Sequence, residues 1–104
     1  MDFDFFENSK KIKISQIKVE LIDSFKLGDI TLVPCYLNNG KTILISYRYE
    51  TQFEGFSIKT GNKGFFYFPN KRILWNRETG KKYYSIRSIE EAVKKSVNLY
   101  YQSI

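Results

Sequence analysis

The sequence predicts an α+β fold, a curved antiparallel β-meander of five to seven strands with one C-terminal α-helix packed on a face. Apolar and polar residues alternate through most of residues 11–87, which is the period of a half-buried strand. From residue 88 onward the apolar residues take the spacing of one helix face instead. The chain has 104 residues, a length that suits a single domain.

The strand segments are short and rich in β-branched residues, which favours strands over helices. Their alternation changes phase at Ser15 and Gln16, and this slip predicts a bulge. Pro34 cannot donate a ladder hydrogen bond, so we expect it at a sheet edge or at a bulge. The expected strands are residues 12–21, 30–37, 41–50, 53–59, 65–68, 72–76 and 82–87.

Two of the glycine-containing turns that join these strands support a specific expectation. Asn38-Asn39-Gly40 predicts a type I′ hairpin turn, which needs positive φ at two central residues. Residues 60–64, Thr-Gly-Asn-Lys-Gly, lack the Gly-Lys-Ser/Thr ending of a Walker loop. We expect a plain turn there, and the alternative is a turn that binds one phosphate through its backbone N–H groups.

One helix is expected over residues 88–102. Ser88 and Glu91 have the spacing of a capping box, in which a hydroxyl and a carboxylate close the first turn. The apolar stripe that should face the sheet consists of Ile89, Val93, Val97, Tyr100 and Ile104, with Ala92 and Ser96 beside it.

The first nine residues differ from the rest of the chain. Three acidic residues alternate there with three phenylalanines, and the first basic residue is Lys10. We therefore expect an acidic aromatic arm over residues 1–9 and a single β-rich domain over residues 10–104. Such an arm could compete with a nucleic acid for a basic groove. The alternatives are a disordered terminus and an edge strand tucked into the core.

The composition excludes several kinds of chemistry. The chain has no histidine and one cysteine, which removes Cys/His zinc sites, histidine bases and internal disulfides. We therefore expect no enzyme, no metal, no cofactor and no small-molecule substrate. Cys35 should be a small buried apolar side chain, because it lies in an apolar strand without a base beside it. No apolar run reaches the roughly 20 residues that span a membrane, so we expect no membrane partner and a cytoplasmic location.

Basic and aromatic residues are interleaved between Lys59 and Arg87, where eight basic residues and seven aromatics accompany one acid. Cations follow the phosphates of a single strand, and aromatic faces stack its bases at roughly 1–3 kcal/mol per base. Since alternate residues of a strand share a face, one aromatic of each pair can enter the core while its neighbour faces a ligand. The opposing interpretation places all the aromatics in the core and leaves the lysines as a solvated surface.

This interleaving predicts a non-catalytic nucleic-acid-binding module for single-stranded DNA or RNA. The alternative is a small inhibitor or adaptor, of the kind that phages and mobile elements encode, that binds another protein. A nucleic-acid groove would gather the cations on one concave face, whereas an adaptor could scatter them and expose an apolar patch. The candidate site residues are Lys41, Arg48, Lys59, Lys63, Arg72, Arg77, Lys82, Tyr67 and Tyr84.

A series of short motifs runs through residues 25–66. The series is Phe25-x-x-Gly28, Val33, Gly40-Lys41, Ile43-Leu44-Ile45, Arg48-Tyr49, Glu54-Gly55 and Lys59-Thr60-Gly61-Asn62-Lys63-Gly64. This order resembles the single-stranded-DNA-binding transcriptional coactivator family known as positive cofactor four. The resemblance implies a homodimer whose four-stranded curved sheets bind single-stranded DNA across the strand faces. It also implies phosphate contacts at Lys41, Arg48, Lys59 and Lys63, with Gly61 and Gly64 shaping the turn at residues 60–64. This sequence departs from the family after residue 66, where an extra hairpin precedes the helix.

Overall fold

The computed structural model describes residues 17–102, which form one antiparallel sheet of eight strands and one helix. The predicted α+β fold is confirmed, and one strand more than expected is present because Phe25–Leu27, which no expected strand included, also pairs with the sheet. The elements are β1 (Val19–Leu21), β2 (Phe25–Leu27), β3 (Ile30–Leu37), β4 (Thr42–Glu50), β5 (Gly55–Thr60), β6 (Lys63–Phe68), β7 (Ile73–Asn76), β8 (Lys82–Tyr83) and α2 (Ile89–Gln102).

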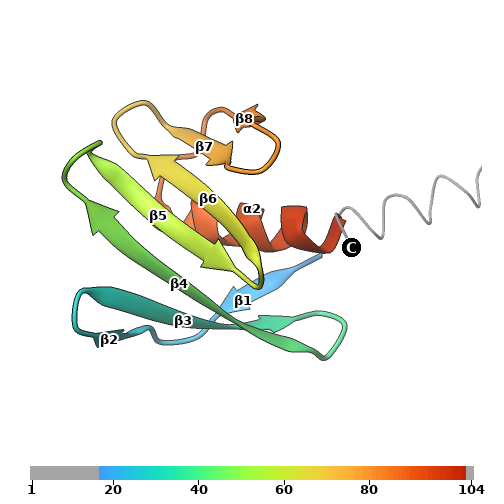
Figure 1. The fold of residues 1–104 in the computed structure, drawn as a ribbon. Helices are drawn as coiled ribbons and strands as arrows, with labels where there is room; N and C mark the ends of the chain where they lie inside the picture. Colours follow the sequence, from blue (N-terminus) through green and yellow to red (C-terminus); the bar gives the residue numbers. More distant parts are fainter. Residues whose placement is uncertain (1–16, 103–104) are drawn as a thin grey trace, which may run out of the picture.

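The sheet follows the order β1-β3-β4-β5-β6-β7-β8, and β2 lies beside β1 on the same edge of β3. It curls around α2, which contacts β1, β5 and β6 (Figure 1). The helix therefore covers the concave face, called the inner face below, while the convex outer face has no covering element among residues 17–102. Within the same residues, α2 is neither long nor apolar enough to cross a bilayer.

Strand alternation decides which residues form the core. Phe65 and Tyr67 on β6 face the helix and are buried, whereas Phe66 and Phe68 between and after them lie on the outer face and are half-buried. Cys35 is buried as expected, and this burial raises the pKa of its thiol to about 11. The buried apolar residues are Val33, Cys35, Leu37, Ile45, Ile58, Phe65, Tyr67, Leu74, Ile86, Ala92, Val93 and Val97.

A buried hydrogen-bond chain joins the helix to the sheet. The hydroxyl oxygens of Thr60 on β5 and Ser96 on α2 lie 2.8 Å apart, and both residues are fully buried. Because Ser96 Oγ donates to the Val93 carbonyl at 2.7 Å, the Thr60 hydroxyl donates to Ser96. Immediately after Thr60, Gly61 adopts φ +60° beneath Tyr100 of α2.

The helix begins where the capping residues predicted it. Ser88 Oγ accepts the Glu91 N–H at 3.1 Å, which is the N-cap bond. The Glu91 carboxylate accepts the N–H of Arg87 at 2.8 Å, one residue before the expected partner. Of the predicted stripe, Val93 and Val97 are buried together with Ala92 and Ser96. Ile89 and Tyr100 are half-buried, and Ile104 lies outside the described residues.

The edge of the sheet contains a bulge, but not at the predicted place. The predicted slip at Ser15 and Gln16 lies outside the described residues. Instead, the registers of β1 and β2 on β3 differ by one residue, so an extra residue lies between Ile22 and Phe25. The Pro34 carbonyl accepts the Ile22 N–H at 2.9 Å on this side of β3. The N–H that Pro34 lacks would point at the bulge, which explains a proline in a strand with neighbours on both sides.

The predicted type I′ turn is wrong. Of the residues between β3 and β4, only Gly40 has a positive φ, of 85°. Gly40 N–H donates to the Leu37 carbonyl, and Leu37 N–H donates to the Lys41 carbonyl. This pattern is a three-residue loop with a glycine in the left-handed region, the next most common hairpin loop after the two-residue turns.

Candidate nucleic-acid interface

Four aromatic side chains lie together on the outer face, in what we call the aromatic cluster: Phe53, Phe66, Phe68 and Trp75. Ring centroids are 5.0 Å apart for Phe53 and Phe66, and 6.1 Å apart for Phe66 and Trp75. The cluster exists because Phe66 pairs with Trp75 across β6 and β7, which places both rings on one side of the sheet. The indole N–H of Trp75 is buried and has no hydrogen-bond acceptor among residues 17–102.

Two predicted cations lie directly over this cluster. The Arg77 guanidinium carbon is 4.8 Å from the centre of the Phe66 ring, and Lys82 Nζ is 5.4 Å from the Trp75 ring. These are cation–π distances. Arg77 reaches Phe66 across Gly64, where a Cβ would lie only 3.1 Å from Arg77 Cδ.

Lys59 extends the same surface. It pairs with Gly64 across β5 and β6, so its side chain projects from the outer face beside the path of Arg77. Lys59 is exposed and makes no ion pair within the described part of the chain. We call Lys59, Arg77, Lys82 and the aromatic cluster the cationic-aromatic face.

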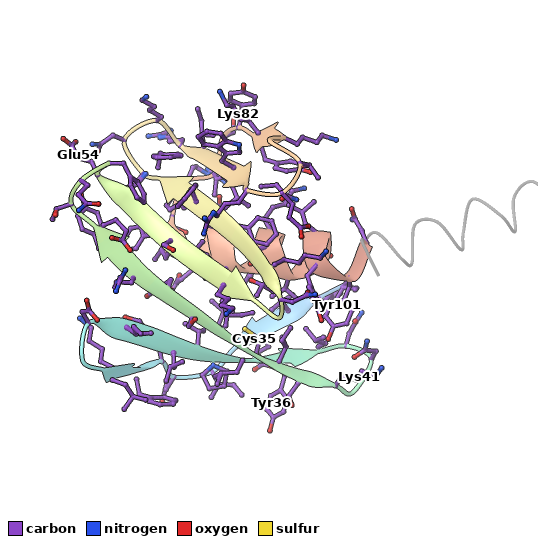
Figure 2. The ribbon with its side chains drawn as sticks, in the orientation of Figure 1. Cys35, Tyr36, Lys41, Glu54, Lys82 and Tyr101 are labelled. Atoms are coloured by element: carbon purple, nitrogen blue, oxygen red, sulfur yellow. The ribbon has the colours of Figure 1, made fainter. Side chains whose placement is uncertain are left out.

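This face does not include the predicted cations Lys41, Arg48 and Lys63. Arg48 lies on the outer face of β4, but its guanidinium is 2.7 Å from Glu50 and 3.8 Å from Asp29. The hydrogen bond and the charge of Glu50, followed by the charge of Asp29, raise the pKa of Arg48. Lys63 forms an ion pair with Glu78 at 3.0 Å. Lys41 lies by the tip of the β3–β4 hairpin, at the far end of the view from Lys82 (Figure 2).

Tyr67 cannot stack a base, and the structure removes it from the candidate set. It lies on the inner face with 1% of its surface exposed. Its hydroxyl donates to the Ile86 carbonyl at 2.9 Å, and burial raises the pKa of this phenol. Tyr67 has the same aromatic character as its neighbours Phe66 and Phe68, but strand alternation places it in the core.

Arg72 and Tyr84 meet at a second place, a hollow of about 540 Å³ between the β6–β7 turn and the segment that joins β8 to α2. We call it the cationic hollow. The sequence prediction missed two of its cations, which the fold brings beside Arg72 and Tyr84. It is lined by Lys71, Arg72, Tyr84, Ser85 and Arg87.

A third feature is a hollow of about 330 Å³ between the β1–β2 connection and the first turn of α2. Apolar and polar residues line it together, and two of the polar ones, Asp23 and Glu90, carry carboxylates. This charge disfavours a phosphate. Within residues 17–102 there is no cluster of three or more His, Cys, Asp or Glu residues that could hold a metal ion.

The outer face of β2, β3 and β4 is apolar rather than cationic. We call its exposed side chains the apolar patch: Phe25, Leu27, Ile30, Tyr36 and Leu44. Strand pairing places these residues on the same side of the sheet as the cationic-aromatic face, and Tyr36 projects from it (Figure 2). The structure therefore combines features of both expected patterns, since cations gather in two places and an apolar patch is exposed. Neither place is the concave face, which α2 fills.

Comparisons with known proteins identify no relative of this chain. No protein-family model matches the chain, and neither the curated proteins nor the solved structures yield a match. The resemblance to the coactivator family therefore stays a prediction.

Proposed function

We propose that this protein binds single-stranded nucleic acid, without catalysis, through the cationic-aromatic face. The observation that supports this most is the placement of Arg77 and Lys82, each over an aromatic ring on a sheet face that no element of residues 17–102 covers. The nearest carboxylate in the sequence, Glu78, is held by Lys63. The charge of this face is therefore available to phosphates.

The geometry suits a flexible strand better than a duplex. Bases of a single strand can turn their flat faces toward the rings or toward the plane of the Arg77 guanidinium, while a duplex keeps those faces stacked internally. Lys59 and Lys82 would follow the phosphates on either side. A convex surface also favours a ligand that bends freely around it.

The test is a fluorescence anisotropy titration with a labelled mixed-sequence single strand and the matching duplex at several salt concentrations. We expect preference for the single strand and a log–log salt slope of about −0.7 per phosphate contacted. Trp75 is the only tryptophan of the chain and lies in the face, so its fluorescence should change on binding.

A pair of charge-matched variants makes this test specific. Arg77→Gln/Lys82→Gln should weaken binding at least about tenfold and lower the salt slope by about 1.4. Lys26→Gln/Lys94→Gln also removes two exposed cations, one on β2 and one on α2, and should change affinity far less. Equal losses in both variants would show that only the general positive charge attracts nucleic acid.

Protein binding by the apolar patch is the second candidate. Phe25, Leu27 and Leu44 each leave about half or more of their surface exposed on a sheet face that the described part of the chain does not cover, and such patches favour protein contacts. A second copy of the chain is one such partner, as the family resemblance implies. Self-association in sedimentation experiments, together with absent oligonucleotide binding in the titration above, would favour this candidate.

A further inference from the structure

We propose that the cationic hollow binds the terminal phosphate of a nucleotide, with the nucleotide base stacked on Tyr84. This inference deepens the proposed function and rests on it for the nucleotide identity of the ligand, but it involves different residues. Three of the five lining residues are cations, and none is a carboxylate. A phosphomonoester carries between one and two negative charges at neutral pH, more than the single charge of an internal phosphodiester.

The cations of the hollow are largely free to take up such a charge. Lys71 and Arg72 make no ion pair within residues 17–102. Arg87 contacts Glu91 through Nε at 3.5 Å, and its two terminal nitrogens form no ion pair within the same residues. An arginine fork binds two phosphate oxygens at once, and the Ser85 hydroxyl can donate a further bond.

The walls of the hollow are held at fixed positions by the backbone. Arg72 and Ser85 adopt φ values of 58° and 66°, a region that non-glycine residues rarely occupy. The Ile86 N–H donates to the Arg72 carbonyl at 3.0 Å, so the two walls are joined directly. The buried Tyr67 hydroxyl in turn donates to the Ile86 carbonyl, which ties both walls to the core. Backbone strain that the surrounding structure maintains in this way is typical of binding sites.

Tyr84 supplies a stacking surface at the rim. Its side chain is 66% exposed, the highest value among the large apolar residues exposed in the described part of the chain. Tyr84 follows Lys82 by two residues. The end of a nucleic-acid strand that crosses the cationic-aromatic face and passes β8 would therefore reach the hollow. Because Tyr84 and Arg72 line the same hollow, a nucleotide with its base on the Tyr84 ring can direct its phosphate toward Arg72.

The test compares one oligonucleotide sequence carrying a 5′-phosphate, a 3′-phosphate or hydroxyl groups at both ends. We expect one phosphorylated end to raise affinity about tenfold, which matches one added charge-assisted hydrogen bond. Equal affinity of all three strands would overturn the proposal. Adenosine 5′-monophosphate serves as the free nucleotide: if it binds as tightly as the phosphorylated strand, the ligand is a mononucleotide, and weaker binding assigns the hollow to strand ends.

Variants locate the phosphate preference. Lys71→Gln/Arg72→Gln should abolish the preference for the phosphorylated strand, while the charge-matched Lys26→Gln/Lys94→Gln retains it. Tyr84→Ala should weaken binding of adenosine monophosphate but not of inorganic phosphate. If the Lys71/Arg72 variant does not fold, the wild-type protein is titrated with the phosphorylated strand and its backbone amide chemical shifts are followed by NMR. Shift changes that do not include Arg72 and Ser85 contradict the proposal.

The two proposals fail separately. If the strand with hydroxyl ends binds tightly and a terminal phosphate adds no affinity, the proposal for the cationic hollow fails and the proposal for the cationic-aromatic face stands. If Arg77→Gln/Lys82→Gln binds like the wild type and the preference for the phosphorylated strand persists, the proposal for the cationic-aromatic face fails and the proposal for the cationic hollow stands.

Discussion

The inner and outer faces of the sheet use the same kinds of residue for different purposes. Phe65 and Tyr67 of β6 are buried beneath α2, while Phe66 and Phe68 of the same strand support the cationic-aromatic face. The division follows from the strand geometry, in which successive side chains point to opposite faces. A high aromatic content is therefore an unreliable measure of a binding site, because half of one aromatic run serves the core. Stability should depend on the inner face and binding on the outer face.

The largest expected loss of stability is found by comparing alanine variants of one aliphatic residue from each face. Ile58 on the inner face is 1% exposed and Leu44 on the outer face is 53% exposed. Ile58→Ala should lower the free energy of unfolding by about 2 to 5 kcal/mol because it leaves a cavity, whereas Leu44→Ala should cost less than about 1 kcal/mol. Urea unfolding measures both. Similar losses would mean that the outer face is covered in solution.

The next effect depends on the inner-face thiol and on pH. Burial raises the pKa of Cys35 from 9.0 to about 11. Between these values the unfolded chain releases the proton and the folded chain keeps it. Stability is therefore intact below about pH 9 and falls by about 2 to 3 kcal/mol as the pH rises to about 11.

Unfolding free energies of the wild type and Cys35→Ala across this pH range measure the thiol contribution. The variant should lose less stability as the pH rises, since the other titrating groups, Tyr67 among them, are common to both proteins. Parallel pH profiles would contradict burial of the thiol. A folded protein whose thiol reacts rapidly with a thiol reagent near neutral pH would contradict it as well.

The smallest expected difference in stability is between glycine variants in two turns, one that packs beneath α2 and one that does not contact it. Gly61 and Gly28 have nearly the same φ, +60° and +64°. Replacing either glycine with alanine should therefore cost about 1 to 2 kcal/mol of stability through backbone strain. A Cβ at Gly61 would lie 2.5 Å from Tyr100 Cε1, while nothing lies within 4 Å of one at Gly28. Gly61→Ala should therefore cost about 1 to 2 kcal/mol more than Gly28→Ala. Equal melting temperatures of the two variants would show that Tyr100 does not pack on this turn.

Local sequence signals predicted most of the fold. The Ser88 cap, the stripe on α2 and the alternation in β3 to β6 depend on neighbours close in sequence, and all three are present. The loop type after β3 was predicted wrongly, and the bulge after Ile22 was not predicted. Both depend on the register between strands, which local composition does not fix.

The candidate site was predicted less completely. Arg77 and Lys82 lie on the aromatic cluster, and Arg72 and Tyr84 share the cationic hollow. Arg48 is paired with Glu50, a same-face neighbour that alternation alone could have identified. The pairing of Lys63 with Glu78 joins residues from different segments and needed the folded structure.

By itself, the sequence determined that this chain forms a basic α+β meander with a capped C-terminal helix. Periodicity and capping are local properties, and charge is a simple count. Only the tertiary structure decided that α2 covers the concave face, that Tyr67 is buried, and that Lys71, Arg72 and Arg87 surround one hollow. Those outcomes depend on which sheet face packs against the helix and on which turns meet in space, and both are set by contacts between residues far apart in the chain.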